Sequence, residues 1–170
     1  KTDIDFNSYG VVKKPELIKA TGEIGEALAC CQMLANELEI AFRKDSVEKV
    51  IRDELRSGAK MSIRLYASIL SMMDLYVSRL QIAAKLGTRL PTPSITYLND
   101  SYCVVKQSNS KGLILASPRD GLIEIKENDL EKEFPNGIEL LFVDRTNTPP
   151  NKKFGVSWFL PSLKRFQASL

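Results

Sequence analysis

The stretch ITYLNDSYCVVKQSNSKGLILASPRDGLIEIK, residues 95–126, decides the fold class. It contains four short runs rich in β-branched, aromatic and other apolar residues, namely ITYL, YCVVKQ, GLILAS and GLIEIK. Polar or glycine-containing turns separate these runs, as consecutive antiparallel strands require. The stretch therefore predicts an antiparallel meander in the middle of the chain.

The segments on either side of this meander add two further strands. YVSRLQIA, residues 76–83, precedes it, and GIELLFVDR, residues 137–145, follows it. AKLGTRL and ENDLEKEF are short helical turns in the intervening positions, and LPTPS is a rigid lead into the strand at residue 95. All predicted strands therefore lie after Leu75.

The first half has the apolar spacing of three helices instead. The first helix is expected to begin after Thr21, its N-cap, and its apolar stripe runs to Leu38. The second opens with Asp45 and Glu48 in capping-box spacing and stops at Gly58. The third runs from about Ser62 to Asp74. Helices followed by consecutive strands predict an α+β fold, in which N-terminal helices pack on a C-terminal antiparallel sheet.

Composition excludes several classes of function. The 170 residues have 44% hydrophobic and 26% charged side chains, which is ordinary for a globular domain. The net charge is only +3, and the basic residues form no stripe with interleaved aromatics, so we expect no nucleic-acid partner. No run approaches the roughly 20 apolar residues of a membrane span, and no signal peptide opens the sequence.

The sequence contains no histidine. This removes the usual general base of serine and cysteine enzymes, and also the commonest zinc ligand. We therefore expect no metal site and no cofactor. Three cysteines, an odd number of which two are adjacent, predict reduced thiols and no disulfide framework.

The segment GEIGEALACCQML, residues 22–34, nevertheless has the pattern of a thiol site, because a helix N-terminus favours ionisation of a nearby thiol. Cys31 falls on the apolar stripe of the predicted helix, and Cys30 shares a different face with Glu26. With no histidine to take its proton, Cys30 is not expected to act as a nucleophile. Cys103 is expected to be an inert strand cysteine.

The ends of the chain differ from the rest. Residues 1–17 are a polar lead-in, and RTNTPPNKK, residues 145–153, is typical of a linker. FGVSWFLPSLKRFQASL, residues 154–170, is strongly aromatic and apolar with Lys164 and Arg165 beside it, which suits a membrane interface or a hydrophobic partner. A C-terminal helix docked on its own domain is the alternative.

Four phrases carry a resemblance to a known family: ACCQMLANELEI, LPTPSITYLNDSYCVVKQ, LILASPRDGLIEIKENDLEKEF and FGVSWFLPSLKRF. From about residue 18 to 170 the chain resembles the papain-like, double-glycine-leader peptidase domain at the N-terminus of ABC exporters, and in particular the degenerate version in type I secretion exporters. The resemblance implies a papain-like cysteine peptidase fold over residues 18–145. Residues 146–170 would be a linker and an amphipathic connector before the first membrane span of the parent transporter.

The resemblance also identifies the positions of the family's catalytic groups. The positions of its Gln and Cys hold Ala20 and Glu26, that of its His holds Ser101, and that of its Asp holds Ser117. None of these side chains can take the corresponding role in the family's mechanism. The resemblance therefore predicts that the chain is not an enzyme, and that ATP hydrolysis by the parent transporter occurs in a domain absent from this sequence.

By the same resemblance, the domain would bind or tether the secreted polypeptide in an unfolded form. It would be a cytoplasmic domain of an inner-membrane transporter, adjacent to the membrane through residues 154–170. The candidate substrate-binding residues are Glu26, Tyr97, Ser101, Tyr102 and Ser117. One alternative is a structural or regulatory module that contacts the nucleotide-binding or membrane domains without binding substrate. A second is a residual thiol hydrolase that uses the cysteines.

Overall fold

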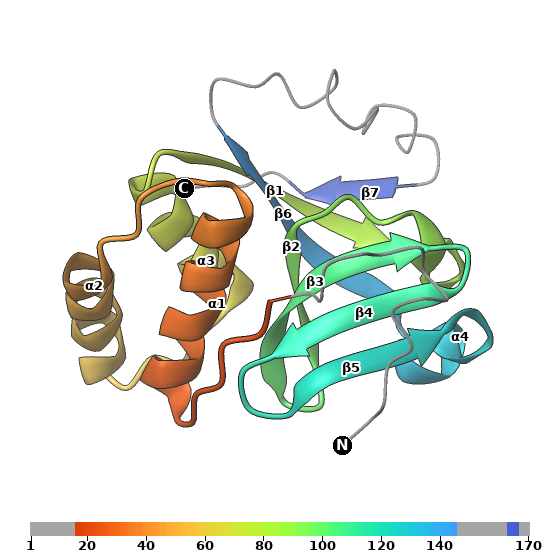
Figure 1. The fold of residues 1–170 in the computed structure, drawn as a ribbon, viewed down its shortest axis with the longest axis horizontal. Helices are drawn as coiled ribbons and strands as arrows, with labels where there is room; N and C mark the ends of the chain where they lie inside the picture. The colour runs from red at the N-terminus through yellow and green to blue at the C-terminus, as the bar shows by residue number, and fades with distance from the viewer. Residues whose placement is uncertain (1–15, 146–162, 167–170) are drawn as a thin grey trace.

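The computed structural model describes residues 16–145 and 163–166. Three helices come first in the chain: α1 (Glu23–Glu37), α2 (Lys44–Arg56) and α3 (Ile63–Met72). They gather at one side of the molecule, and most of the sheet lies at the other (Figure 1). The predicted α+β class, with N-terminal helices packed on an antiparallel sheet, is confirmed.

The strands of the described residues form one sheet in the order β5-β4-β3-β2-β6-β1-β7, with every neighbouring pair antiparallel. Their bounds are β1 (Leu75–Ile82), β2 (Ser94–Leu98), β3 (Ser101–Asn109), β4 (Gly112–Ser117), β5 (Gly121–Lys126), β6 (Ile138–Arg145) and β7 (Leu163–Phe166). The four strands β2 to β5 are the meander that residues 95–126 predict.

Two apolar cores cover the two faces of this sheet. On one face, Ile95, Val104 and Leu141 pack with the buried side chains of α1, α2 and α3. On the other face, Val105 and Phe142 pack with residues of η2 (Ala84–Arg89) and of the short helix α4 (Leu130–Glu133), which follows η3 (Glu127–Asp129). Val104 and Val105 thus alternate between the two cores, as adjacent strand residues do.

The helix starts differ in part from the prediction. Gly22, with φ of 85°, is the N-cap of α1 and has no side chain to cap it, so Thr21 as N-cap is wrong. The capping box of Asp45 and Glu48 is also wrong, because α2 begins at Lys44 and Glu48 pairs with Arg52 at 2.6 Å. The start of α3 follows the prediction, and Ser62 is its N-cap, where it accepts a hydrogen bond from the backbone N–H of Leu65.

The C-terminal segment is described only at residues 163–166. These four residues form β7, which pairs antiparallel with β1 so that Ile82 lies opposite Leu163. The docked-helix alternative does not hold for these four residues. The remainder of the predicted connector, and residues 1–15 of the predicted lead-in, lie outside the described residues. Among the described helices, none has the length and apolar character needed to cross a membrane.

Candidate functional site

A cavity of about 470 Å³ opens where the helices meet the meander. Its lining residues come from the first turn of α1, from α3 and the loop before it, from the β2–β3 hairpin, and from the turn between β4 and β5. These segments are far apart in the sequence, and the packing of α1 against β3 brings them together. The cavity is therefore a product of the tertiary fold.

Three tyrosines form one wall of this cavity. The ring of Tyr66 lies edge-on to Tyr102 with centroids 5.1 Å apart, and Tyr102 lies 4.7 Å from Tyr97. Tyr66 is 1% exposed and Tyr97 is 47% exposed, so the row runs from the core to the surface. Tyr97 and Tyr102 are opposite residues of β2 and β3, and this register fixes their contact. We call these three residues the tyrosine wall.

Carboxylates lie beside the tyrosine wall. Glu26, in the first turn of α1, is half-buried, and its side chain makes no hydrogen bond or ion pair with the described residues. Glu23 accepts a hydrogen bond from the backbone N–H of Met61 at 2.8 Å. Asp100 is exposed in the β2–β3 turn, where its φ of 62° is one that Asn and Asp tolerate better than most residues.

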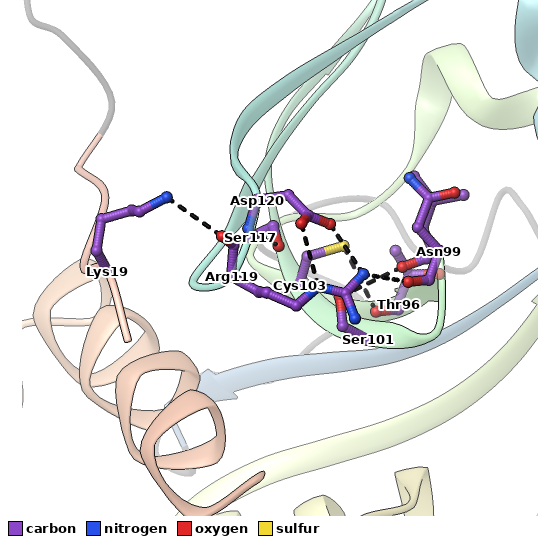
Figure 2. Close-up of polar contacts among 9 residues, drawn as sticks. Lys19, Thr96, Asn99, Ser101, Cys103, Ser117, Arg119 and Asp120 are labelled. Atoms are coloured by element: carbon purple, nitrogen blue, oxygen red, sulfur yellow. Dashed lines mark hydrogen bonds and ion pairs between the residues drawn. The ribbon is translucent and has the colours of Figure 1, made fainter. Parts of the chain in front are cut away.

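Arg119 connects the two turns that border the cavity (Figure 2). Its Nε and Nη2 donate to the two carboxylate oxygens of Asp120 at 3.1 and 3.0 Å, and Nη2 also donates to the carbonyl of Asn99. Hydrogen bonding to Arg119 holds the pKa of Asp120 below its usual value, and the same pair raises the pKa of Arg119. Lys19 donates to the Arg119 carbonyl at 3.2 Å, which adds the chain before α1 to this cluster.

The three cysteines are buried, Cys30 and Cys31 in the core on the helix side of the sheet and Cys103 in the core on the opposite side. Cys30 and Cys31 have no exposed surface, and the Cys30 thiol lies 3.6 Å from the carbonyl of Tyr102. Burial raises the pKa of Cys30 to about 12 and also raises the pKa of Cys31 and Cys103. All three thiols are therefore protonated at neutral pH. Sequence periodicity placed Cys30 off the buried stripe, but β3 covers that face of α1 as well.

The cavity brings together most of the candidate residues. Four of the five candidate substrate-binding residues line it, namely Glu26, Tyr97, Ser101 and Tyr102. Ser117 is buried outside the lining and accepts a hydrogen bond from the backbone N–H of Asp120 at 3.0 Å. Ala20 lies just before α1, where its N–H donates to the Pro118 carbonyl at 3.0 Å. Their assignment to a substrate-binding role stays a prediction.

Sequence reasoning missed four charged groups of the lining: Glu23, Lys60, Asp100 and Arg119. Arg119 had a local signal, because it lies in the short PRD turn that follows Ser117. Glu23 and Lys60 had none, since both look like ordinary solvated residues near a helix end. Chemically, the cavity offers carboxylate acceptors, guanidinium and ammonium donors, a serine hydroxyl and aromatic faces. The described residues contain no group of three or more metal-ligating side chains.

Residues 16–147 match the peptidase C39 family, and the chain belongs to this family. It is similar in structure to a double glycine motif protease from an AMS/PCAT transporter, solved in complex with the leader peptide. The TM-score is 0.62 at 16% identity, covering 78% of this chain and 93% of that one. It is also similar to the peptidase domain of Streptococcus ComA, a bi-functional ABC transporter involved in a quorum sensing pathway. For this second structure the TM-score is 0.61 at 12% identity, and the match covers 78% of this chain and 99% of that one. No curated protein matches the chain in sequence.

These findings confirm the expected family and its papain-like fold. They contradict the prediction that the chain is not an enzyme, because the C39 family is a family of peptidases. That prediction rested on the residue types at Ala20, Glu26, Ser101 and Ser117 and on the absence of histidine from the sequence. The assignment of the family's catalytic positions to these residues came from the resemblance alone, and the family match does not test it.

Proposed function

We propose that this domain binds an extended segment of a polypeptide exported by an ABC transporter, and that the 470 Å³ cavity holds the segment. The observation that carries the proposal is the meeting of Glu26, Ser101 and the tyrosine wall in one cavity. Membership of the C39 family supports it. So does the solved structure of similar fold that contains a leader peptide.

The lining groups complement an extended backbone. The Glu26 carboxylate accepts hydrogen bonds from peptide N–H groups, and the cationic groups of Lys60 and Arg119 donate to peptide carbonyls. The tyrosine faces contact apolar parts of the segment. Ordering an unfolded segment costs conformational entropy, so we expect modest affinity from the isolated domain. Attachment to the transporter would compensate by raising the local concentration of the domain at the channel.

The proposed setting is the cytosolic face of an inner membrane. The domain would be part of the transporter itself, with residues 146–170 leading to the first membrane span. Its partners would be the secreted polypeptide and the membrane and nucleotide-binding domains of the same transporter. Contact with those domains alone, without binding of substrate, is the competing function.

The test is a ¹⁵N NMR titration with unfolded leader and C-terminal segments of candidate cargo proteins encoded in the same operon. A natively folded form of each cargo is the control. We expect selective shifts at the lining residues, with Glu26, Tyr97 and Ser101 among them. Mass spectrometry of each segment after titration records whether it is bound intact or cleaved, and either result supports engagement of the cavity.

Two results would overturn the proposal. Shifts confined to surfaces away from the cavity would mean that a segment binds elsewhere on the domain. If no segment changes the NMR signals, the competing function is favoured. A titration with the transporter's own nucleotide-binding domain would then test that function directly.

A further inference from the structure

Glu26 is an unusual carboxylate for this cavity. It is half-buried beside aromatic rings, and its side chain forms no hydrogen bond or ion pair with the described residues, although it interacts with the charge of Arg119 across the cavity. A carboxylate that has lost part of its hydration gains more from a cation or a strong donor than a fully solvated one does. By contrast, Glu37, Glu48 and Glu139 each form an ion pair, and all three lie outside the cavity.

The two cations in the lining form no direct ion pair with this carboxylate. Arg119 directs its Nε and Nη2 at Asp120, and its charge reaches Glu26 and Asp100 only at longer range. Lys60 is exposed on the loop before α3 and forms no ion pair with the described residues. Three carboxylates face these two cations: Glu23, Glu26 and Asp100. Three carboxylates against two cations leave the lining with a negative balance.

The tyrosine wall supplies a second, independent attraction for a cation. The faces of electron-rich rings attract ammonium and guanidinium groups, and a guanidinium also stacks on them. Tyr97 is 47% exposed and Tyr102 is half-buried, so their rings are accessible from the cavity mouth. Ser101, 5% exposed, and Tyr66, 1% exposed, are the most buried residues of the lining. A long side chain can thus lie along the rings and place its charged end at the carboxylate.

We propose that Glu26 and the tyrosine wall form a subsite for one basic side chain of the bound segment, and that this subsite prefers arginine to lysine. The inference rests on the proposed function, and it names the substrate class, a polypeptide segment with a basic residue at the cavity. Arginine is preferred because its planar guanidinium can hydrogen-bond a carboxylate and stack on a ring together.

The test uses three blocked tripeptides with neutral ends, Ac-Ala-Arg-Ala-NH₂, the lysine counterpart and the citrulline counterpart. Citrulline has nearly the shape of arginine without its charge. NMR titration at low salt follows the Glu26 side-chain carboxyl and the rings of Tyr97 and Tyr102. We expect binding to weaken at least tenfold from arginine to citrulline, with lysine between them. We also expect 0.5 M salt to reduce the difference, because exposed charge interactions are screened.

Variants separate the subsite from nonspecific attraction. Glu26→Gln keeps the shape of the side chain and should abolish the preference for arginine over citrulline. Tyr97→Leu should reduce the preference by about threefold or more through loss of the cation–π contact. Glu54→Gln on the exposed face of α2 removes the same charge far from the cavity and should change nothing.

Equal binding of the arginine and citrulline peptides, or no shift with either, would overturn the inference. The proposed function would still stand after such a result if cargo segments change the NMR signals of the cavity residues. Failure of all cargo segments, by contrast, counts against the proposed function itself. A preference for arginine that survives Glu26→Gln would also overturn the inference, because the attraction would then come from other carboxylates.

Discussion

The guanidinium of Arg119 donates a hydrogen bond to the backbone carbonyl of Asn99, across the gap between two strand turns (Figure 2). Asn99 lies in the β2–β3 turn, and Arg119 lies in the β4–β5 turn. Because β3 and β4 are neighbours in the sheet, their outer turns meet at the same end. This contact holds one rim of the cavity in place, and it also places Arg119 beside Asp120.

Arg119→Gln should raise the pKa of the Asp120 carboxyl, because hydrogen bonding to Arg119 holds that pKa below its usual value. The measurement is the ¹³C carboxyl shift of Asp120 followed against pH. Arg52→Gln is the matched control, since Arg52 pairs with Glu48 on α2 and does not contact Asp120. An unchanged Asp120 titration in Arg119→Gln would contradict the assigned cause.

The sign of the accompanying pH effect on stability follows from the lowered pKa. A carboxyl whose folded-state pKa lies below its unfolded value stabilises the fold at pH values above the unfolded pKa. That contribution is lost as the pH falls through the folded-state pKa, in the acid range below the ordinary value of 3.8. In Arg119→Gln the acid unfolding midpoint should therefore rise slightly, since Asp120 is exposed and its pair is screened by solvent.

Gly112→Ala should destabilise the fold strongly, by about 3 kcal/mol or more. Gly112 begins β4 with φ of 133°, and an added Cβ would lie 2.0 Å from the carbonyl oxygen of Ile125. Gly58 is the matched control, because it also has a positive φ, of 93°, but has no atom within 4 Å of an added Cβ. Gly58→Ala should cost about 1–2 kcal/mol, from backbone strain alone. Urea unfolding measures both, and equal costs would contradict the close contact.

Ser62→Ala should cost about 1 kcal/mol, because Ser62 caps α3 through a hydrogen bond from the Leu65 N–H at 3.1 Å. Ser57 provides a comparison at the end of α2, where its exposed hydroxyl donates to the Glu54 carbonyl at 3.0 Å. Ser57→Ala should stay within about 0.5 kcal/mol of the wild type, as surface substitutions usually do. Thermal unfolding of both variants decides, and a cost at Ser57 equal to that at Ser62 would count against the cap.

The strands were predictable because their signals are local. GLILAS and GLIEIK each begin with glycine, have an apolar or alternating pattern, and end at a polar turn. The observed bounds of β4 and β5 coincide with these two segments. The helix caps were less predictable. Thr21 and Asp45 have side chains that can cap a helix, but the N-caps are Gly22 for α1 and Arg43 for α2. At α1 the positive φ of Gly22 decides the start, and only the backbone shows this.

The lining of the cavity was predictable only where residues close together in the sequence form it. Tyr97 and Tyr102 flank one tight turn, so their contact follows from strand pairing. Arg119 enters the site because two turns twenty residues apart meet, and no local pattern contains that information. The prediction that the chain is not an enzyme was made from residue types at single positions and from composition, and the family match contradicts it.

The thiols of the folded protein should react slowly, because burial raises the pKa of Cys30 to about 12 and leaves Cys30, Cys31 and Cys103 without access. At pH 8, Ellman's reagent should label them at least about 100-fold more slowly than in urea, where thiols titrate near 8.5. A raised folded-state pKa stabilises the fold below the unfolded pKa, so stability should fall as the pH rises above about 9. Met72→Cys supplies the control, since Met72 is 53% exposed on α3 and a thiol there should react at once. Labelling of Cys30 at the rate of that control would show an accessible, ionisable thiol beside Tyr66, and Cys30 would then be the first residue to test as the peptidase nucleophile.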